Sequence, residues 1–159
     1  MEEKILNTKW KVYTYSELSA EDKALVEEAK AATDGAHVPY SHFCVGAAVR
    51  NSKGQIFRGS NQENVSFPAG CCAERVTMHY AHTSAPKEHF TAIAVAARSA
   101  DTGKFIAKPI SPCGVCRQAM VEYEKIAGAP LRIILYGASE IYVIEEGVKA
   151  LLPFCFDDF

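Results

Sequence analysis

The spacing of apolar residues predicts helices and strands that alternate along the whole chain. Ser19 can cap a first helix together with Asp22, and that helix ends before Gly35. The other expected helices cover about 73–83, a segment from a first turn at Pro112 to about Ala127, and a short closing helix at 148–152. The expected strands are 43–49, 55–58, 90–97, 131–136 and 141–144.

The order of these elements indicates an α/β fold. Residues 90–97 are apolar almost throughout, which is typical of a central strand covered on both faces. We therefore predict a single three-layer α/β/α domain with a mixed five-stranded sheet and helices on both faces. Residues 1–15 precede the first predicted helix as a polar and aromatic lead-in.

Composition and charge argue against several classes of partner. The chain has 159 residues, 48% of them hydrophobic and 23% charged, which is ordinary for one globular domain. Its net charge of −2 argues against nucleic-acid binding, because a phosphate-tracking surface needs clustered Lys and Arg. No apolar run approaches the roughly 20 residues that span a membrane, and the first residues do not resemble a secretion signal. We therefore expect a cytoplasmic protein with no membrane or nucleic-acid partner.

Six cysteines are unevenly distributed, and in a reducing compartment they indicate a metal site rather than disulfides. Cys113 and Cys116 form a C-x-x-C at a predicted helix start. Taken alone, this motif is compatible with a redox pair, half of a structural zinc site or two buried cysteines. The redox interpretation requires a thioredoxin-like unit, which the predicted element order lacks. Cys44 and Cys155 stand alone and are expected to be small buried apolar residues.

A second cysteine motif supplies a third thiolate. Cys72 begins another predicted helix and is followed by Ala73 and Glu74. Three thiolates with water in the fourth position fit a catalytic zinc, because a structural site normally closes with four protein ligands. Adjacent residues rarely both reach one tetrahedral ion, so Cys71 is assigned to packing. Arg75 is expected to lie next to the thiolates and to offset their charge with both helix N-termini; the alternative is a solvated surface charge.

The two cysteine motifs together match the zinc deaminase signature H-x-E…P-C-x-x-C, with Cys72 in the histidine position. From about residue 24 to Phe156 the chain resembles the small homotetrameric zinc-dependent cytidine deaminases. The motifs that carry the resemblance are CAER at 72–75, SPCGVCRQ at 111–118, PYSHF at 39–43, VGAA at 45–48, GSNQEN at 59–64 and LLP at 151–153. The resemblance implies a cytidine deaminase-like catalytic domain at 16–159, with 1–15 as an N-terminal extension.

The activity that the resemblance implies is hydrolytic deamination of free cytidine and 2′-deoxycytidine to uridine and 2′-deoxyuridine plus ammonia, as in pyrimidine salvage. Cys72, Cys113 and Cys116 would hold one Zn²⁺ per subunit. Glu74 would act as general base on the zinc water and then carry the proton to the pyrimidine ring nitrogen and the leaving amine. On the residues alone, Glu74 is also consistent with an acid placed favourably in the first turn of a helix.

The resemblance also implies a set of substrate contacts. Asn61 and Glu63 match the family pair that hydrogen-bonds the ribose hydroxyls, although the residues alone would favour a solvated loop. Ala73 matches the position whose backbone contacts the pyrimidine edge, and Phe43 matches a residue that packs at the substrate pocket. Phe156 corresponds to an aromatic residue that stacks on the base from a neighbouring subunit. This last match implies a homotetramer with active sites shared between subunits.

Two other functions are weighed against this one. A related deaminase for a modified nucleoside or a cytosine-bearing antibiotic is the first, and Asn61 with Glu63 favours a plain ribosyl substrate instead. A nucleic-acid editor or zinc-dependent binding module is the second, and both the net charge and Glu74 argue against it. The chain departs from the family at Phe67, where a tyrosine is usual, and in its short tail after Phe156. These departures bear on substrate preference or tetramer packing rather than on the metal chemistry.

Overall fold

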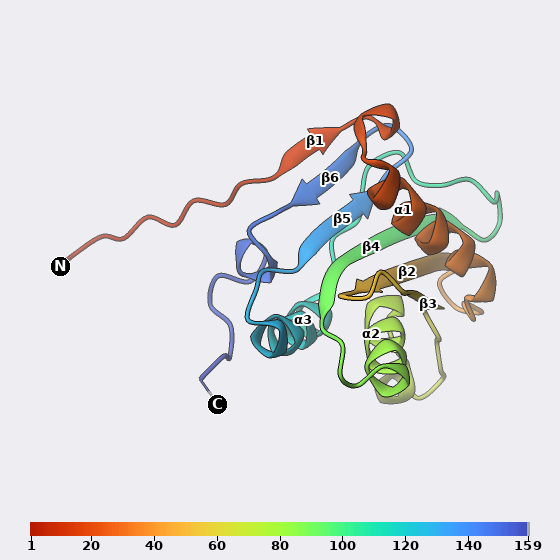
Figure 1. Ribbon diagram of the computed structural model, residues 1–159. Coiled ribbons are helices and arrows are strands. Elements are labelled where there is room, and N and C mark those ends of the chain that lie inside the picture. The colour runs from red at the N-terminus through yellow and green to blue at the C-terminus, as the bar shows by residue number, and fades with distance from the viewer. Residues whose placement is uncertain (159) are drawn as a thin grey trace.

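A six-stranded mixed sheet forms the centre of the structure, a computed structural model that describes residues 1–158. The strands are β1 Lys11–Tyr13, β2 Phe43–Asn51, β3 Ile56–Ser60, β4 Phe90–Ser99, β5 Arg132–Tyr136 and β6 Ile141–Ile144; the α-helices are α1 Ala20–Ala32, α2 Ala73–Ser84 and α3 Gly114–Ala127. The strand order is β1-β6-β5-β4-β2-β3. Helix α1 covers one face of the sheet, and α2 and α3 cover the other (Figure 1).

Alternate residues of β4 contribute to two separate cores, because successive side chains of a strand point to opposite faces. Ile93 and Val95 belong to the core that α2 and α3 cover, whereas Ala92, Ala94 and Ala96 belong to the core under α1. All five residues are buried, which confirms the prediction of a central strand covered on both faces. The small alanine side chains on the α1 side let that helix pack close to the strands.

The three-layer architecture is confirmed, but the prediction of five strands is wrong. The additional strand is β1, which lies inside the segment predicted to be a polar and aromatic lead-in. It pairs antiparallel with β6, with Lys11 opposite Val143 and Tyr13 opposite Ile141. Backbone hydrogen bonds define this pairing, and the side chains of Lys11 and Val12 are exposed, so no apolar alternation marks the strand in the sequence.

The first helix begins as predicted. The Ser19 hydroxyl caps α1 by accepting a hydrogen bond from the Asp22 N–H at 3.1 Å. The Asp22 carboxylate is buried and accepts hydrogen bonds from Arg132 of β5, the shorter of them at 2.9 Å. A residue expected to serve the cap therefore also connects α1 to the sheet.

Several predicted boundaries differ from the structure by one to three residues, and two of the differences concern helices. Helix α3 begins at Gly114 with Cys113 as its N-cap residue, so Pro112 precedes the helix rather than occupying its first turn. The expected closing helix is a single 3-10 turn at Val148–Ala150. Each difference amounts to a few residues at an element end, where local sequence signals are weakest.

Strand directions determine where α2 and α3 begin. Strand β2 is antiparallel to both β3 and β4, and β4 is parallel to β5, so β3, β4 and β5 run in one direction. The segments that contain α2 and α3 are therefore crossover connections, and both helices start at the edge of the sheet where β3 and β4 end. None of the helices in the described part of the chain is long and apolar enough to cross a membrane.

Replacing Gly46 of β2 with alanine should lower the free energy of unfolding by about 1–3 kcal/mol, the usual cost of overpacking a core. A Cβ atom there would collide with the Ala29 carbonyl oxygen and lie 2.7 Å from the Thr33 nitrogen, which forces α1 away from the sheet. Urea titration measures the change. Gly114→Ala is the control, since a Cβ there meets nothing within 4 Å and stability should be unchanged or higher. Equal stability of Gly46→Ala and the unaltered chain would contradict this packing.

Candidate metal centre and active site

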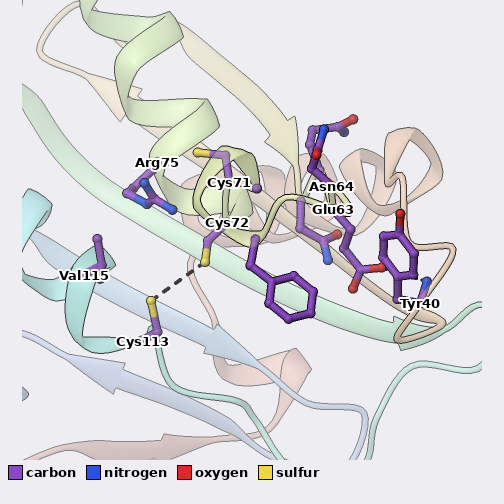
Figure 2. Close-up of a pocket in the computed structure, with 12 residues that line it drawn as sticks. Tyr40, Glu63, Asn64, Cys71, Cys72, Arg75, Cys113 and Val115 are labelled. Atoms are coloured by element: carbon purple, nitrogen blue, oxygen red, sulfur yellow. Dashed lines mark hydrogen bonds between the residues drawn. The ribbon is translucent and has the colours of Figure 1, made fainter.

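Three cysteine thiols come together where α2 and α3 begin. Cys72 is the N-cap residue of α2, Cys113 is the N-cap residue of α3, and Cys116 lies in the first turn of α3. The sulfur atoms of Cys72 and Cys113 are 3.8 Å apart (Figure 2), and those of Cys113 and Cys116 are 3.5 Å apart. All three sulfur atoms lie within 4.8 Å of one another, so the structure assembles the set predicted as metal ligands.

A zinc ion fits this donor set. Zn–S bonds of about 2.3 Å in a tetrahedron separate neighbouring sulfur atoms by about 3.8 Å. The sulfur–sulfur distances of 3.8 and 3.5 Å are close to this value, so the helices need little movement to bind the ion. Cys71 lies outside the cluster formed by the described residues, as expected. Three thiolates leave the fourth position for water or substrate, which is the arrangement of a catalytic zinc. The cluster accommodates one zinc ion per subunit.

Positive charge faces the thiols from Arg75 and from the two helix N-termini. A hydrogen bond from the Cys116 thiol, assisted by Cys113 and Arg75, lowers the pKa of Cys72 to about 5. The same thiol–thiol bond raises the pKa of Cys116. The Nε atom of Arg75 is buried and has no hydrogen-bond partner within residues 1–158. Thiolates bound to a metal beside this guanidinium would compensate for the buried donor, which agrees with the predicted placement of Arg75.

Glu74 is buried in the first turn of α2, with 4% of its surface exposed. Burial raises the pKa of this carboxyl group, and the neighbouring Cys116 thiol acts in the opposite direction. Glu74 therefore lies next to the thiol cluster without belonging to it. A carboxyl group with a raised pKa exchanges its proton closer to neutral pH, as a general acid–base catalyst must.

A cavity of about 400 Å³ opens beside the thiols, a size within the range of small-molecule sites. Five of the predicted site residues line it: Asn61, Glu63, Cys72, Arg75 and Cys113. Figure 2 shows the two thiols toward one end of the cavity and the Glu63 carboxylate toward the other. A ligand that fills the cavity can therefore contact the metal centre and the polar loop at the same time.

The Asn61 side chain connects the loop after β3 to the first residues of β2. Its Oδ1 accepts a hydrogen bond from the Val45 N–H at 2.8 Å, and its Nδ2 donates to the Phe43 carbonyl at 2.9 Å. An amide has two donor hydrogens and two acceptor lone pairs, so these bonds use half of its capacity. Asn61 is thus held rigidly at the cavity wall and is not a solvated loop residue.

Backbone donors hold the Glu63 carboxylate. Its Oε2 accepts hydrogen bonds from the N–H groups of Tyr40 at 3.0 Å and Ser41 at 3.2 Å. A hydrogen bond with the Ser41 side chain and these backbone bonds together lower the pKa of Glu63. The carboxylate is therefore ionised at neutral pH, the form that accepts hydrogen bonds from hydroxyl groups.

Three predicted substrate contacts do not line this cavity. Ala73 is fully buried in the core under α2 and α3, and the half-buried Phe43 packs against the same core. The backbone of Phe156 forms two hydrogen bonds with the Gln118 side chain of α3, and the residue borders a different hollow between α2 and α3. Phe156 is 70% exposed there, so its ring is presented to the outside rather than to the cavity of its own subunit.

Several cavity residues were not predicted as site residues. Tyr40, Asn64 and Val115 line the cavity, and Phe67 and Cys71 do so as well. Tyr40, Val115 and Phe67 are apolar or aromatic yet more than half exposed. Tyr40, Asn64 and Val115 lie inside the motifs PYSHF, GSNQEN and C-x-x-C, whereas Phe67 was noted only as a departure from the family. Cys71, which was assigned to packing, is half-buried at the cavity wall.

Residues 19–128, which contain the clustered thiols and Glu74, match the family model for the cytidine and deoxycytidylate deaminase zinc-binding region. The chain belongs to this deaminase family. A cytidine deaminase from Halalkalibacterium halodurans is 39% identical over 132 residues, covering 83% of this chain and 91% of that protein. A blasticidin-S deaminase from Bacillus cereus is 29% identical over 106 residues, covering 67% and 75%. A crystal structure of cytidine deaminase from Burkholderia pseudomallei matches at a TM-score of 0.69 and 37% identity, covering 84% of this chain and 97% of that one.

Cys113→Ala should abolish stoichiometric zinc binding, because the two remaining thiolates of this family's metal site bind the ion poorly. The variant should also unfold at a lower temperature, since metal binding supports the folded state. Zinc per subunit by elemental analysis and thermal unfolding measure the two effects. Cys155→Ala is the matched control, because this half-buried cysteine lies outside the cluster and its loss should leave zinc content unchanged. Full zinc occupancy in Cys113→Ala would refute the ligand assignment.

Proposed function

We propose that this protein catalyses hydrolytic deamination of free cytidine and 2′-deoxycytidine to uridine and 2′-deoxyuridine with release of ammonia. The observation that carries the proposal is the cluster of three thiols at zinc-binding spacing next to the buried Glu74 carboxyl. A purely structural zinc site would not need a buried acid beside it. A spectrophotometric assay of cytidine conversion by the purified, zinc-quantified protein tests the proposal.

In this mechanism Cys72, Cys113 and Cys116 would hold the zinc ion, which would supply an activated water as the nucleophile near neutral pH. Glu74 takes the proton that the water loses when it adds to C4 of the cytosine ring. It then protonates ring atom N3 and finally the amino group that leaves as ammonia. Burial of Glu74 supports this role, because its raised pKa suits both the acceptance and the release of a proton.

The remaining contacts position the nucleoside. We propose that the ionised Glu63 carboxylate accepts hydrogen bonds from a ribose hydroxyl and that the Asn61 amide contacts the sugar with its remaining capacity. The Ala73 backbone would bind the pyrimidine edge, and Phe43 would support the pocket from the core. Support comes from the placement of Glu63 and the thiols toward opposite ends of one cavity, which suits a molecule with a sugar and a base (Figure 2).

The alternative substrate is a modified nucleoside or a cytosine-bearing antibiotic. One of the relatives above is named a blasticidin-S deaminase. The cytidine deaminase relative is more similar and is covered over more of its length. The Glu63 carboxylate, which the Tyr40 and Ser41 N–H groups hold in place, also favours a substrate with ribose hydroxyls. Parallel assays with cytidine, 2′-deoxycytidine and blasticidin S separate the two possibilities by their kcat/KM values.

The proposed assembly is a homotetramer with shared active sites. Its support is that Phe156 borders a hollow away from the cavity of its own subunit, while exposed apolar residues surround the cavity. Residues 16–159 would form the catalytic domain and 1–15 an extension whose strand β1 widens the sheet. We also propose a cytoplasmic role in pyrimidine salvage. All six cysteines are free thiols, in keeping with a reducing compartment.

Glu74→Gln should retain zinc and fold normally but lose activity by about 10²–10⁴-fold or more, because one residue serves several proton transfers. The glutamine side chain keeps the shape of the carboxyl group and cannot exchange a proton. Measurement of kcat together with zinc content checks this outcome. Retention of more than about a tenth of the wild-type turnover would exclude Glu74 as the proton carrier.

Phe156→Ala should raise the KM for cytidine by roughly 10-fold or more, since stacking of a base on an aromatic ring contributes about 1–3 kcal/mol. Mixing these subunits with Glu74→Gln subunits tests whether the ring serves a neighbour. Mixed oligomers should then contain sites that combine a functional Glu74 with an intact Phe156, and activity should exceed that of both parents. If activity does not recover after verified subunit exchange, Phe156 acts within its own subunit or in packing.

A further inference from the structure

The turn that carries the two N–H donors to Glu63 ends in an unusual backbone conformation. Residues 38–42 form this turn, closed by a hydrogen bond from the His42 N–H to the Val38 carbonyl at 3.1 Å. His42 has a φ of 55° and is the one non-glycine residue with positive φ within residues 1–158. This left-handed conformation is costly for most L-residues, although histidine adopts it more readily than many. Contacts from outside the turn therefore matter for its stability.

Two such contacts come from the segment that follows β4. Asp101 Oδ1 lies 2.7 Å from His42 Nδ1, and the Ala100 N–H donates to the His42 carbonyl at 2.8 Å. The hydrogen bond with Asp101 raises the pKa of His42, and the charge of Glu63 acts in the same direction, so the cationic ring is favoured. The His42 and Asp101 side chains are 56% and 68% exposed, so the pair is accessible and separate from the core.

The same turn contacts the cavity through its other residues. Tyr40 and Ser41, which directly precede His42, both donate their backbone N–H groups to Glu63 Oε2. Figure 2 shows Tyr40 and Glu63 together at the end of the cavity away from the thiols. A change in the backbone of His42 therefore redirects the two donors that orient the carboxylate.

We propose that the His42–Asp101 pair is a positioning element that holds the 38–42 turn in place and thereby orients Glu63 toward the sugar of the substrate. The inference rests on the proposed function, in which Glu63 binds a ribose hydroxyl. Neither His42 nor Asp101 lines the cavity or belongs to the thiol cluster. The pair therefore affects the KM for the nucleoside through Glu63 and leaves kcat and zinc content unchanged.

Asp101→Asn tests this inference, because it removes the charge from an exposed residue without changing its size. We expect a KM for cytidine up to about fivefold higher, the range for loss of an exposed ion pair, with kcat and zinc content unaltered. His42→Asn should give a similar rise, since asparagine also tolerates the left-handed backbone but cannot form the ion pair. Glu28→Gln is the matched control: it breaks the exposed Glu28–Arg58 ion pair of 2.8 Å between α1 and β3 and should leave KM unchanged.

A double-mutant cycle with Glu63→Gln identifies the route of the effect. If the pair acts through Glu63, Asp101→Asn should raise KM in the wild-type background and add nothing in the Glu63→Gln background. An unchanged KM in Asp101→Asn, or an equal rise in both backgrounds, would overturn the inference. So would an unchanged KM in Glu63→Gln.

Failure of the proposed function gives a different result. In that case the zinc-loaded wild-type protein does not deaminate cytidine. If the wild-type protein is active and Glu63→Gln raises KM while Asp101→Asn does not, only the role of the His42–Asp101 pair is wrong.

Discussion

The meeting of two helix N-termini at one edge of the sheet is the constraint on which the rest of the site depends. Strands β3, β4 and β5 run in the same direction, so β3–α2–β4 and β4–α3–β5 are both crossover connections between parallel strands. When successive crossover connections have the same handedness and move across the sheet in the same direction, their helices lie on the same face of the sheet. Both helices then start at the same edge, and Cys72 and Cys113 occupy equivalent N-cap positions with their sulfur atoms 3.8 Å apart.

This placement also determines the electrostatics of the metal centre. Three thiolates around a divalent ion carry net negative charge, and each helix N-terminus provides about half a positive charge. Arg75, in the first turn of α2, adds a full positive charge at the thiols. Isolated thiolates would be costly in a partly buried position. The positive charges of the helix N-termini and of the guanidinium lie next to the thiolates, and they stabilise the cluster there.

Two carboxyl groups in the site have opposite environments. Glu74 is buried in the first turn of α2, and burial raises its pKa. Glu63 lies in a loop where hydrogen bonds from Ser41 and Tyr40 lower its pKa. Opposite shifts of this kind separate a group that exchanges protons from one that stays charged. In the proposed mechanism this contrast would give the protein a proton carrier beside the thiol cluster and a fixed hydrogen-bond acceptor toward the other end of the cavity.

The sequence by itself determined the chemistry of the site and most of the fold. The C-x-x-C and C-A-E spacings predicted the three thiols that cluster, and apolar periodicity predicted five of the six strands and all three α-helices, because these signals are local. The fourth predicted helix, at 148–152, is only a 3-10 turn. Only the tertiary structure revealed β1, since its pairing with β6 rests on backbone bonds that leave no side-chain pattern. The structure alone also showed that the Asn61 side chain forms hydrogen bonds with the first residues of β2. It showed as well that Phe156 lies away from the cavity beside the thiols of its own subunit. These facts depend on contacts between residues far apart in the chain, and no local pattern encodes such contacts.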